Sequence, residues 1–233
     1  MSKQREKPIE FNAYASDYAE LIRDPIRDKF AASNQFFFER KLQIIREFCR
    51  SRNVDTHELD WIDVGCGQGD LLRLGSDYFR SAAGCDPSEG MLESCSDLNV
   101  RTQPSLVSLP FESASFDLVT VVCVYHHIPM EQRLAFTREA FRLLKAGGFF
   151  CNVEHNPLNP VTRLIVSRTP VDADAQLLRA KESRKLIHEA GGRLLETQYF
   201  LLFPEFIHKY AGVIEDWLTF APLGGQYAVF AQR

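Results

Sequence analysis

The feature that most constrains the fold of this sequence is a stretch, from about residue 58 to 154, in which short apolar runs alternate with helical segments. The apolar runs are Trp61–Val64, Ala82–Cys85, Phe116–Tyr125 and Phe149–Val153, and each is typical of a buried strand. Strands that alternate with helices predict crossover connections, and therefore a mostly parallel sheet covered on both faces. Ligands of such sheets bind beyond the carboxyl ends of the strands, so functional residues are expected where these runs end.

A glycine-rich turn, DVGCGQGD at residues 63–70, follows the first predicted strand. Glycines allow a tight turn and a close approach of the backbone to a ligand. The dinucleotide fingerprint needs a third glycine at position 70, where this chain has Asp70, and no P-loop Lys-Ser/Thr pair follows. The Asp70 carboxylate disfavours a pyrophosphate but tolerates an ammonium or sulfonium. Asp86 ends the second strand, where a carboxylate can accept hydrogen bonds from ribose hydroxyls, so a nucleoside ligand is predicted.

Further motifs follow the glycine turn in a fixed order: CDP at 85–87, LPF at 109–111, SFDLV at 115–119, VYHHI at 124–128 and EAFRLLKAGG at 139–148. Together these residues resemble the class I S-adenosylmethionine-dependent methyltransferases, in the branch of type 11-like enzymes that includes many small-molecule and quinone methylases. The resemblance implies an α/β, Rossmann-like fold with a seven-stranded, mostly parallel sheet, an antiparallel last strand at 226–231 and helices on both faces. It also implies one domain, with an N-terminal helical cap (1–57), a cofactor-binding core (58–154) and a substrate-side insertion with the C-terminal strands (155–233).

The resemblance further implies S-adenosylmethionine as the cofactor and assigns roles by position. The glycine turn would lie against the methionine part of the cofactor, Asp86 would hold the ribose, and Pro87 and Met91 would flank the adenine. The family usually has an acidic residue where this chain has Ser105, so the Ser105 hydroxyl or the Leu106 backbone is expected to contact the adenine. The implied cofactor-binding residues are Tyr18, Asp63, Gly65, Cys66, Gly67, Asp86, Pro87, Met91, Ser105, Leu106, Val122 and Cys123.

Three histidines fall at the carboxyl ends of predicted strands, namely His126, His127 and His155. Imidazole is the natural general base near neutral pH, so His127 and His155 are the candidate catalytic residues. The alternative is a structural role, which is common for paired histidines in the resembling family. No Asn/Asp-Pro-Pro-aromatic motif follows the fourth strand, which disfavours amide and base-amine acceptors and leaves hydroxyl, carboxyl, amine or carbon acceptors, of which oxygen is preferred. No metal site is predicted, because adjacent histidines on a strand point to opposite faces.

The residues after 154 are expected to lie across the substrate opening. The candidate substrate-binding residues are Tyr125, His126, Asn156, Asn159, Arg163 and Tyr227. An apolar stripe over 203–217 favours a core or dimer face, with a lid or acceptor groove as the alternative, and a homodimer is one expectation. The tail resembles a bacterial subgroup associated with cell-surface saccharide synthesis, which suggests a saccharide-related acceptor.

The net charge and the cysteines limit which partners and which cellular compartment are expected. The formal net charge is −4, from 27 basic and 31 acidic residues of interleaved sign, which argues against a dedicated nucleic-acid partner. The charged N-terminus predicts no signal peptide, and no apolar run approaches the ~20 residues of a membrane helix. The six cysteines include no C-x-x-C pair, so reduced thiols and a cytoplasmic location are expected.

The preferred function is therefore an S-adenosylmethionine-dependent methyltransferase acting on a small-molecule acceptor. One alternative is an S-adenosylmethionine-binding protein without transferase activity, acting as a partner or regulatory subunit. Another is an enzyme that uses the same cofactor for non-methyl chemistry such as cyclisation. A nicotinamide oxidoreductase is disfavoured by Asp70 at the position of the third glycine.

Overall fold

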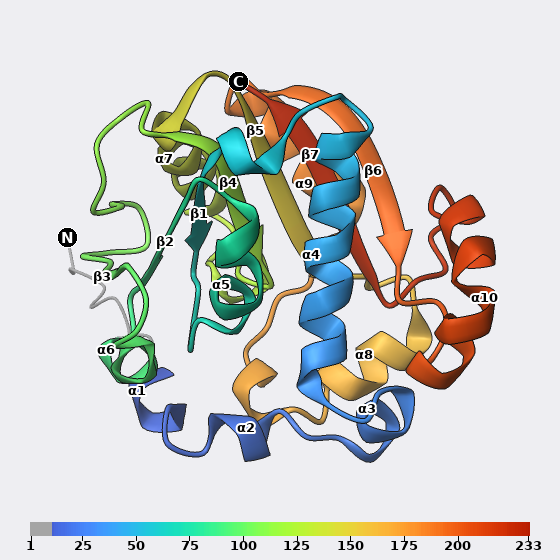
Figure 1. Ribbon diagram of the computed structural model, residues 1–233. Coiled ribbons are helices and arrows are strands. Elements are labelled where there is room, and N and C mark those ends of the chain that lie inside the picture. The colour runs from blue at the N-terminus through green and yellow to red at the C-terminus, as the bar shows by residue number, and fades with distance from the viewer. Residues whose placement is uncertain (1–10) are drawn as a thin grey trace.

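The computed structural model describes residues 11–233, which contain a seven-stranded sheet in the order β3-β2-β1-β4-β5-β7-β6 (Figure 1). The strands are β1 (Asp60–Val64), β2 (Ser81–Asp86), β3 (Val100–Thr102), β4 (Phe116–Val122), β5 (Leu144–His155), β6 (Arg193–Phe200) and β7 (Gln226–Gln232). The pairs from β3 to β5 are parallel, whereas β7 runs antiparallel to both of its neighbours, β5 and β6. The predicted sheet, with its antiparallel last strand, is confirmed.

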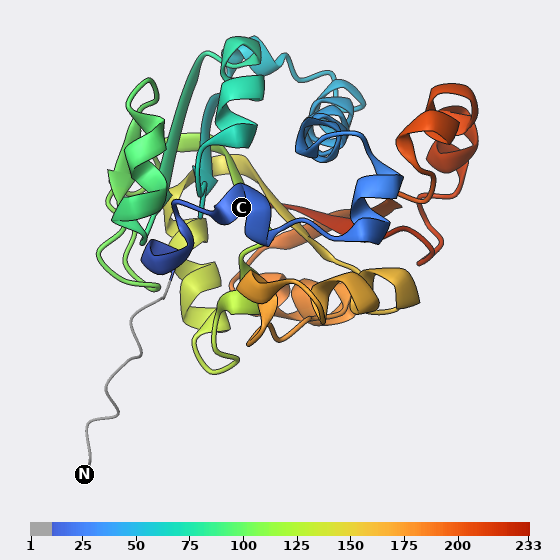
Figure 2. The same ribbon diagram turned by 90° about the horizontal axis from the view of Figure 1, so that it is seen from below.

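Helices cover both faces of the sheet, and Figure 2 shows α4 and α5 on one side of it and α7 and α9 on the other. The helices are α1 (Phe11–Tyr14), α2 (Tyr18–Leu21), α3 (Pro25–Phe30), α4 (Asn34–Arg50), α5 (Asp70–Gly75), α6 (Glu89–Leu92), α7 (Arg133–Leu143), α8 (Pro160–Val166), α9 (Ala180–Glu189) and α10 (Glu205–Trp217). Strand β7 contributes side chains to the cores on both faces of the sheet, because successive side chains of a strand point to opposite faces. Tyr227 and Val229 join the core under α7 and α9, while Ala228 and Phe230 join the core under α4.

The segment before α4 lies along the carboxyl edge of the sheet. Figure 2 shows the short helices α1, α2 and α3 crossing this edge in front of the strands. Helix α3 begins at Pro25 because the Asp24 carboxylate accepts a hydrogen bond from the backbone N–H of Ile26 at 2.8 Å. The Ala15 carbonyl accepts a further bond from Gln68 of the glycine turn at 2.9 Å, so the N-terminal segment is held over the ends of β1 and β2.

The apolar stripe of α10 is not part of the core. Phe206, Tyr210 and Trp217 are 63%, 92% and 78% exposed, and α10 lies at the margin of the molecule beyond β6 (Figure 1). The helix is attached through the buried Glu215 carboxylate, which accepts a hydrogen bond from Arg40 of α4 at 2.8 Å. The expectation of a core face is therefore wrong, whereas the dimer, lid and groove interpretations stay predictions.

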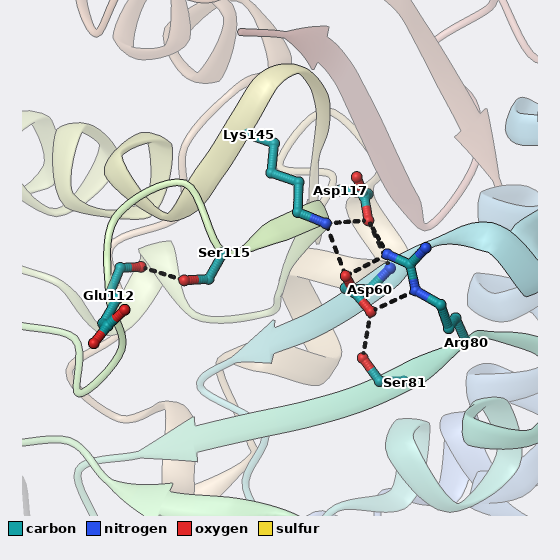
Figure 3. A network of polar contacts seen from close by, with 7 residues as sticks. All are labelled: Asp60, Arg80, Ser81, Glu112, Ser115, Asp117 and Lys145. Carbon is teal, nitrogen blue, oxygen red and sulfur yellow. Dashed lines mark hydrogen bonds and ion pairs between the residues drawn. The ribbon is translucent and has the colours of Figure 1, made fainter.

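A polar network closes the opposite edge of the sheet, at the amino ends of β1 and β4 (Figure 3). The Lys145 ammonium lies 2.7 Å from a carboxylate oxygen of Asp60 and 2.8 Å from one of Asp117. Arg80 also pairs with both carboxylates, and the Ser81 hydroxyl donates to Asp60 at 2.8 Å. This network joins four strands at the edge of the sheet remote from the glycine turn.

Two expectations about the whole chain can be compared with the structure. All six cysteines carry free thiols, as their spacing predicted. No helix within residues 11–233 is both long enough and apolar enough to cross a membrane.

Candidate active site

A cavity of about 460 Å³ opens at the carboxyl ends of β1, β2, β4 and β5, the edge of the sheet where the sequence predicted function. Its wall is mostly apolar and includes residues from α2, α3, α4 and α8. The N-terminal segment, the glycine turn and the insertion after β5 thus contribute to one enclosed space. Such a cavity, with a few polar groups set in an apolar wall, is the usual form of a small-molecule site.

The glycine turn forms one wall of this cavity. Gly65 and Gly67 have left-handed backbone angles, with φ of 77° and 53°. A Cβ on Gly65 would lie 2.4 Å from the Val124 side chain, whereas one on Gly67 would meet no atom within 4 Å. A side chain at position 65 would therefore clash with Val124. A side chain at position 67 would project into open space and reduce the room for a ligand.

Asp86 closes the next part of the wall. One of its carboxylate oxygens accepts a hydrogen bond from the backbone N–H of Gly67 at 2.9 Å, and the other accepts one from Ser88 at 2.9 Å. Each oxygen retains a lone pair for a ligand hydroxyl. Pro87 and Met91 line the cavity beside this carboxylate. An open glycine turn beside a fixed carboxylate acceptor and an apolar slot fits the amino-acid, ribose and adenine parts of S-adenosylmethionine.

The floor of the cavity is formed by the ends of β1 and β4. The buried Asp63 carboxylate accepts a hydrogen bond from Thr120 at 2.6 Å, and burial raises its pKa to about 7. Cys123 has a left-handed backbone with φ of 57°, which is a strained conformation for a residue with a side chain. Strand β4 therefore ends at Val122, earlier than predicted, and the chain turns into the 3₁₀ segment η4 (Tyr125–His127).

A buried charge cluster lies at the ends of β4 and β5, beside the cavity. His126 Nδ1 lies 2.6 Å from a Glu154 carboxylate oxygen, and its Nε2 lies 3.5 Å from Asp172, which the insertion contributes. Burial opposes a charge on His126, but the two carboxylates outweigh it and raise its pKa to about 9. The second Glu154 oxygen accepts a hydrogen bond from the backbone N–H of Tyr125 at 2.7 Å. His126 is thus cationic at neutral pH and held in place.

His127 and His155 lie beside this cation and are neutral. Burial, and then the charge of His126, lower the pKa of His127 to about 3 and that of His155 to about 4. The ring of His127 packs edge-on against Phe11 at 4.9 Å between centroids. Both imidazoles line the cavity, where each offers a ring nitrogen without a proton above about pH 4.

His126, His127 and Asp172 also present three donor atoms within 4.8 Å of one another. The sequence argument that adjacent histidines must diverge is wrong here, because they lie on a 3₁₀ turn and both Nε2 atoms face Asp172 at 3.5 Å. A proton nevertheless competes with any cation for this place. With Glu154 bound to Nδ1 and Asp172 facing Nε2, the His126 imidazolium balances the carboxylates, and a protonated His126 has no lone pair for a metal.

The structure brings most of the predicted residues to the cavity wall. Those that line it are Tyr18, Asp63, Gly65, Cys66, Gly67, Asp86, Pro87, Met91, Leu106, Val122, Cys123, His126, His127, His155 and Asn159. Their position agrees with the predicted site, while their individual roles in binding and catalysis stay predictions.

Five predicted contacts do not reach the cavity wall, namely Ser105, Tyr125, Asn156, Arg163 and Tyr227. The two tyrosines are buried in the core, where their hydroxyls bond to Thr137 and to the Leu178 carbonyl. Asn156 is used by the fold, since its amide donates to the Pro222 and Gly224 carbonyls. Arg163 is on the exposed face of α8, and Ser105 pairs with Ser108 in an isolated bridge. These five predictions are corrected.

Several polar residues of the cavity were missed as site residues by sequence reasoning, namely Arg27, Lys41, Gln103, Asp172 and Gln226. Gln103 follows β3 and lies in the wall where the sequence placed Ser105. Asp172 was visible as one of several charged residues in the insertion, but nothing in the sequence distinguished it from its neighbours. Lys41 is part of the amphipathic helix α4, and the apolar periodicity of that helix does not show that a lysine of it enters the cavity.

Comparisons with known proteins agree with this site. A family model described as a methyltransferase domain matches residues 62–152. The demethylmenaquinone methyltransferase of Lactococcus lactis is 30% identical over 175 residues, which are 69% of this chain and 64% of that protein. The tRNA (carboxymethyluridine(34)-5-O)-methyltransferase alkbh8 of Xenopus tropicalis is 36% identical over 91 residues, 37% of this chain and 14% of that protein. The chain therefore spans less than two thirds of each of these relatives.

A solved structure described as an S-adenosylmethionine-dependent methyltransferase from Archaeoglobus fulgidus has the same fold. It superimposes with a TM-score of 0.62 at 16% sequence identity, covering 86% of this chain and 100% of that one. The likeness therefore extends well outside residues 62–152.

Proposed function

We propose that this chain is a class I S-adenosylmethionine-dependent methyltransferase, which transfers the methyl group of this cofactor to a small-molecule acceptor; the match of residues 62–152 to a methyltransferase domain supports the proposal. The observation that carries the proposal is the cavity itself, which is lined by the glycine turn and Asp86 as well as by three histidines. The cofactor side and the acceptor side of a transferase are thus parts of one space.

The chain's own residues would hold the cofactor and leave its methyl group accessible to the acceptor. Gly65, Gly67 and Asp63 would bound its amino-acid part, Asp86 would accept the ribose hydroxyls, and Gln103 and Met91 would bound the adenine. When bound, S-adenosylmethionine supplies an electrophilic methyl group, whose bond to sulfur breaks with the electron pair remaining on sulfur. The helices across the carboxyl edge exclude water, which otherwise competes with the acceptor.

The acceptor atom is proposed to be an oxygen, with His155 as the base. An oxygen that gains a methyl group becomes strongly acidic as it loses electron density, so a base of low pKa can remove its proton. His155 is neutral at pH 7 and lines the cavity, so its one unprotonated ring nitrogen can receive the proton of the acceptor hydroxyl. His127 is the second candidate for this role. Positioning of the acceptor supplies most of the remaining rate enhancement.

A small molecule is favoured over RNA by the shape and charge of the site. The cavity is apolar and covered by the N-terminal segment, whereas a nucleic-acid site needs a basic surface that can track phosphates. The similarity to the tRNA methyltransferase is limited to 37% of this chain. A saccharide-related acceptor gains no support from this apolar wall.

The test combines cofactor binding with product identification. Calorimetry is expected to show binding of S-adenosylhomocysteine and no binding of NAD. Methyl-tritiated cofactor is then incubated with small-molecule and RNA fractions of a cell extract, and label is expected in the small-molecule fraction. Label in RNA alone would refute the proposed acceptor class, and binding without any transfer would favour the alternative of a regulatory protein.

The base assignment has its own control. His155→Gln is expected to lower kcat strongly and to leave cofactor affinity unchanged, whereas His188→Gln, on the exposed face of α9, is expected to change neither. Full turnover of both His155→Gln and His127→Gln would show that neither imidazole is the base.

A further inference from the structure

Two basic side chains enter the cavity from the N-terminal helices without forming an ion pair with any of residues 11–233, although aspartates also line the cavity. Lys41 of α4 is 6% exposed and lines the cavity, with its ammonium 4.6 Å from the centre of the Phe38 ring. It makes no ion pair or hydrogen bond with any residue from 11 to 233. Arg27 of α3 lies 4.9 Å from the centre of the Phe37 ring and donates to the Ile22 carbonyl at 2.6 Å. Among the described residues it too has no carboxylate within 4.0 Å.

An unpaired charge in an apolar wall is costly unless a partner arrives. Contact with an aromatic ring offsets only part of the lost hydration. Lys145, which is more exposed than Lys41, is by contrast paired with two carboxylates. Lys41 and Arg27 therefore indicate an anionic group on a ligand.

Both cations line the same cavity as Cys123, at the end of β4. Burial raises the pKa of the Cys123 thiol to about 12, and both Lys41 and Arg27 oppose that rise. The Gln226 amide donates towards this sulfur at 3.5 Å, while its oxygen is buried in the cavity wall without a hydrogen-bond donor from residues 11–233. The region around Cys123 thus contains an unused acceptor as well as two cations.

The surroundings of the cations are apolar and aromatic. Phe30, Phe37 and Phe38 line the cavity from α3 and α4, and Ile165 and Leu202 line it from α8 and the segment before α10. All five residues lie outside residues 62–152, the part of the chain that matches the methyltransferase domain.

We infer that the methyl acceptor is an amphiphilic acid, whose carboxylate or phosphate binds Lys41 and Arg27 and whose apolar body packs against the phenylalanines. This inference rests on the proposed methyltransferase function and specifies its substrate class. The reacting group of this acceptor is a hydroxyl, which donates its one proton to the unprotonated ring nitrogen of His155. The oxygen gains the methyl group, its proton passes to His155, and the carbon–sulfur electrons stay on sulfur.

The experiment measures binding of matched probes to the wild-type protein saturated with S-adenosylhomocysteine. The probes are octanoate, octyl phosphate and octan-1-ol, which share an apolar chain and differ in charge. Calorimetry is expected to give a Kd for at least one anion that is about tenfold or more below that of the alcohol. Equal affinity for all three would overturn the inference without any variant.

Variants then locate the charge. Lys41→Met and Arg27→Met are each expected to reduce the preference for the anion about tenfold, while Lys29→Met, an exposed position on α3, leaves it unchanged. If a methionine variant does not fold, Lys41→Gln and Arg27→Gln are measured in its place. A preference retained in all of these variants would overturn the inference.

The cofactor's own carboxylate is the competing partner, and the same variants distinguish it. If both methionine variants lose S-adenosylhomocysteine affinity while the probes bind as before, the cations hold the cofactor and the inference is wrong. If the wild-type protein binds no S-adenosylhomocysteine, the proposed function fails instead, and the probe preference is then measured on the unliganded protein. The two failures are therefore distinguishable.

Discussion

Replacing Glu154 by Gln tests the buried charge cluster directly. The substitution keeps the side-chain oxygen that accepts from the Tyr125 backbone and removes the charge that faces His126 at 2.6 Å. In the wild-type protein the carboxylates raise the pKa of His126 to about 9, against the effect of burial. Without Glu154, burial is the largest remaining effect, so His126 becomes neutral at pH 7.

The pH dependence of stability follows from this difference. A histidine whose folded pKa is raised stabilises the folded state fully below its unfolded pKa, and that stabilisation is lost as pH rises through the folded pKa. The unfolded value is about 6.5, so the loss begins there and continues to about 9. At pH 6.5 His126 is about half charged in the unfolded chain, and by pH 8.5 it has lost that charge. In the folded chain it stays mostly charged over this range. Integrated at 1.36 kcal/mol per proton and pH unit, the loss is about 2 kcal/mol.

The assay is urea unfolding of the wild type and Glu154→Gln at about pH 6.5, 7.5 and 8.5, followed by circular dichroism. Taking the difference between the two proteins cancels the titration of their other groups. Glu154→Gln is expected to be less stable at pH 6.5, and its deficit is expected to shrink by about 2 kcal/mol at pH 8.5. Glu131→Gln, which removes an exposed charge, is expected to follow the wild type at each pH. A deficit that does not change with pH would refute a charged His126.

Three further predictions concern the cofactor side and the metal question. Asp86→Ala is expected to weaken S-adenosylhomocysteine binding by about 1–3 kcal/mol, because two ribose hydroxyls lose their acceptor, and unchanged calorimetric affinity would contradict this role. Gly65→Ala is expected to lower the free energy of unfolding by about 1–3 kcal/mol more than Gly67→Ala, since only its Cβ would lie 2.4 Å from Val124; equal losses in urea would contradict the packing argument. Dialysis against EDTA is expected to leave Tm and methyl transfer unchanged, because His126 carries a proton where a metal would need a lone pair, and a loss restored by zinc would show otherwise.

Local sequence was sufficient for the cofactor side of the site. Each strand carries its own apolar run, and the residues that follow it must emerge at the carboxyl edge of a parallel sheet. Gly65 and Asp86 could therefore be assigned from their positions after β1 and β2, before their contacts were known. The backbone of the turn, in which Gly67 donates to Asp86, is built from residues close to the ends of two paired strands.

The acceptor side could not be assigned in the same way, because it depends on how distant segments meet. Tyr227 was expected to reach the site, but the register of β7 against β5 directs it into the core under α9. His126 and His127 were expected to diverge, but the left-handed Cys123 ends β4 and places both on a 3₁₀ turn. Asp172 meets them only because the insertion folds back, with the Gln176 N–H bonded to the His126 carbonyl at 2.7 Å.

The sequence by itself thus determined a mostly parallel sheet, the edge at which its cavity opens and the glycine turn and Asp86 that line it, because periodicity and glycine turns act over a few neighbouring residues. Only the tertiary structure decided which charges share the cavity. Lys41 and Arg27 indicate an anionic ligand only because neither forms an ion pair with another of the described residues. His126 stays protonated because Glu154 and Asp172 together raise its pKa. Electrostatic effects of this kind depend on distance in space and on exclusion of water, neither of which a linear pattern specifies.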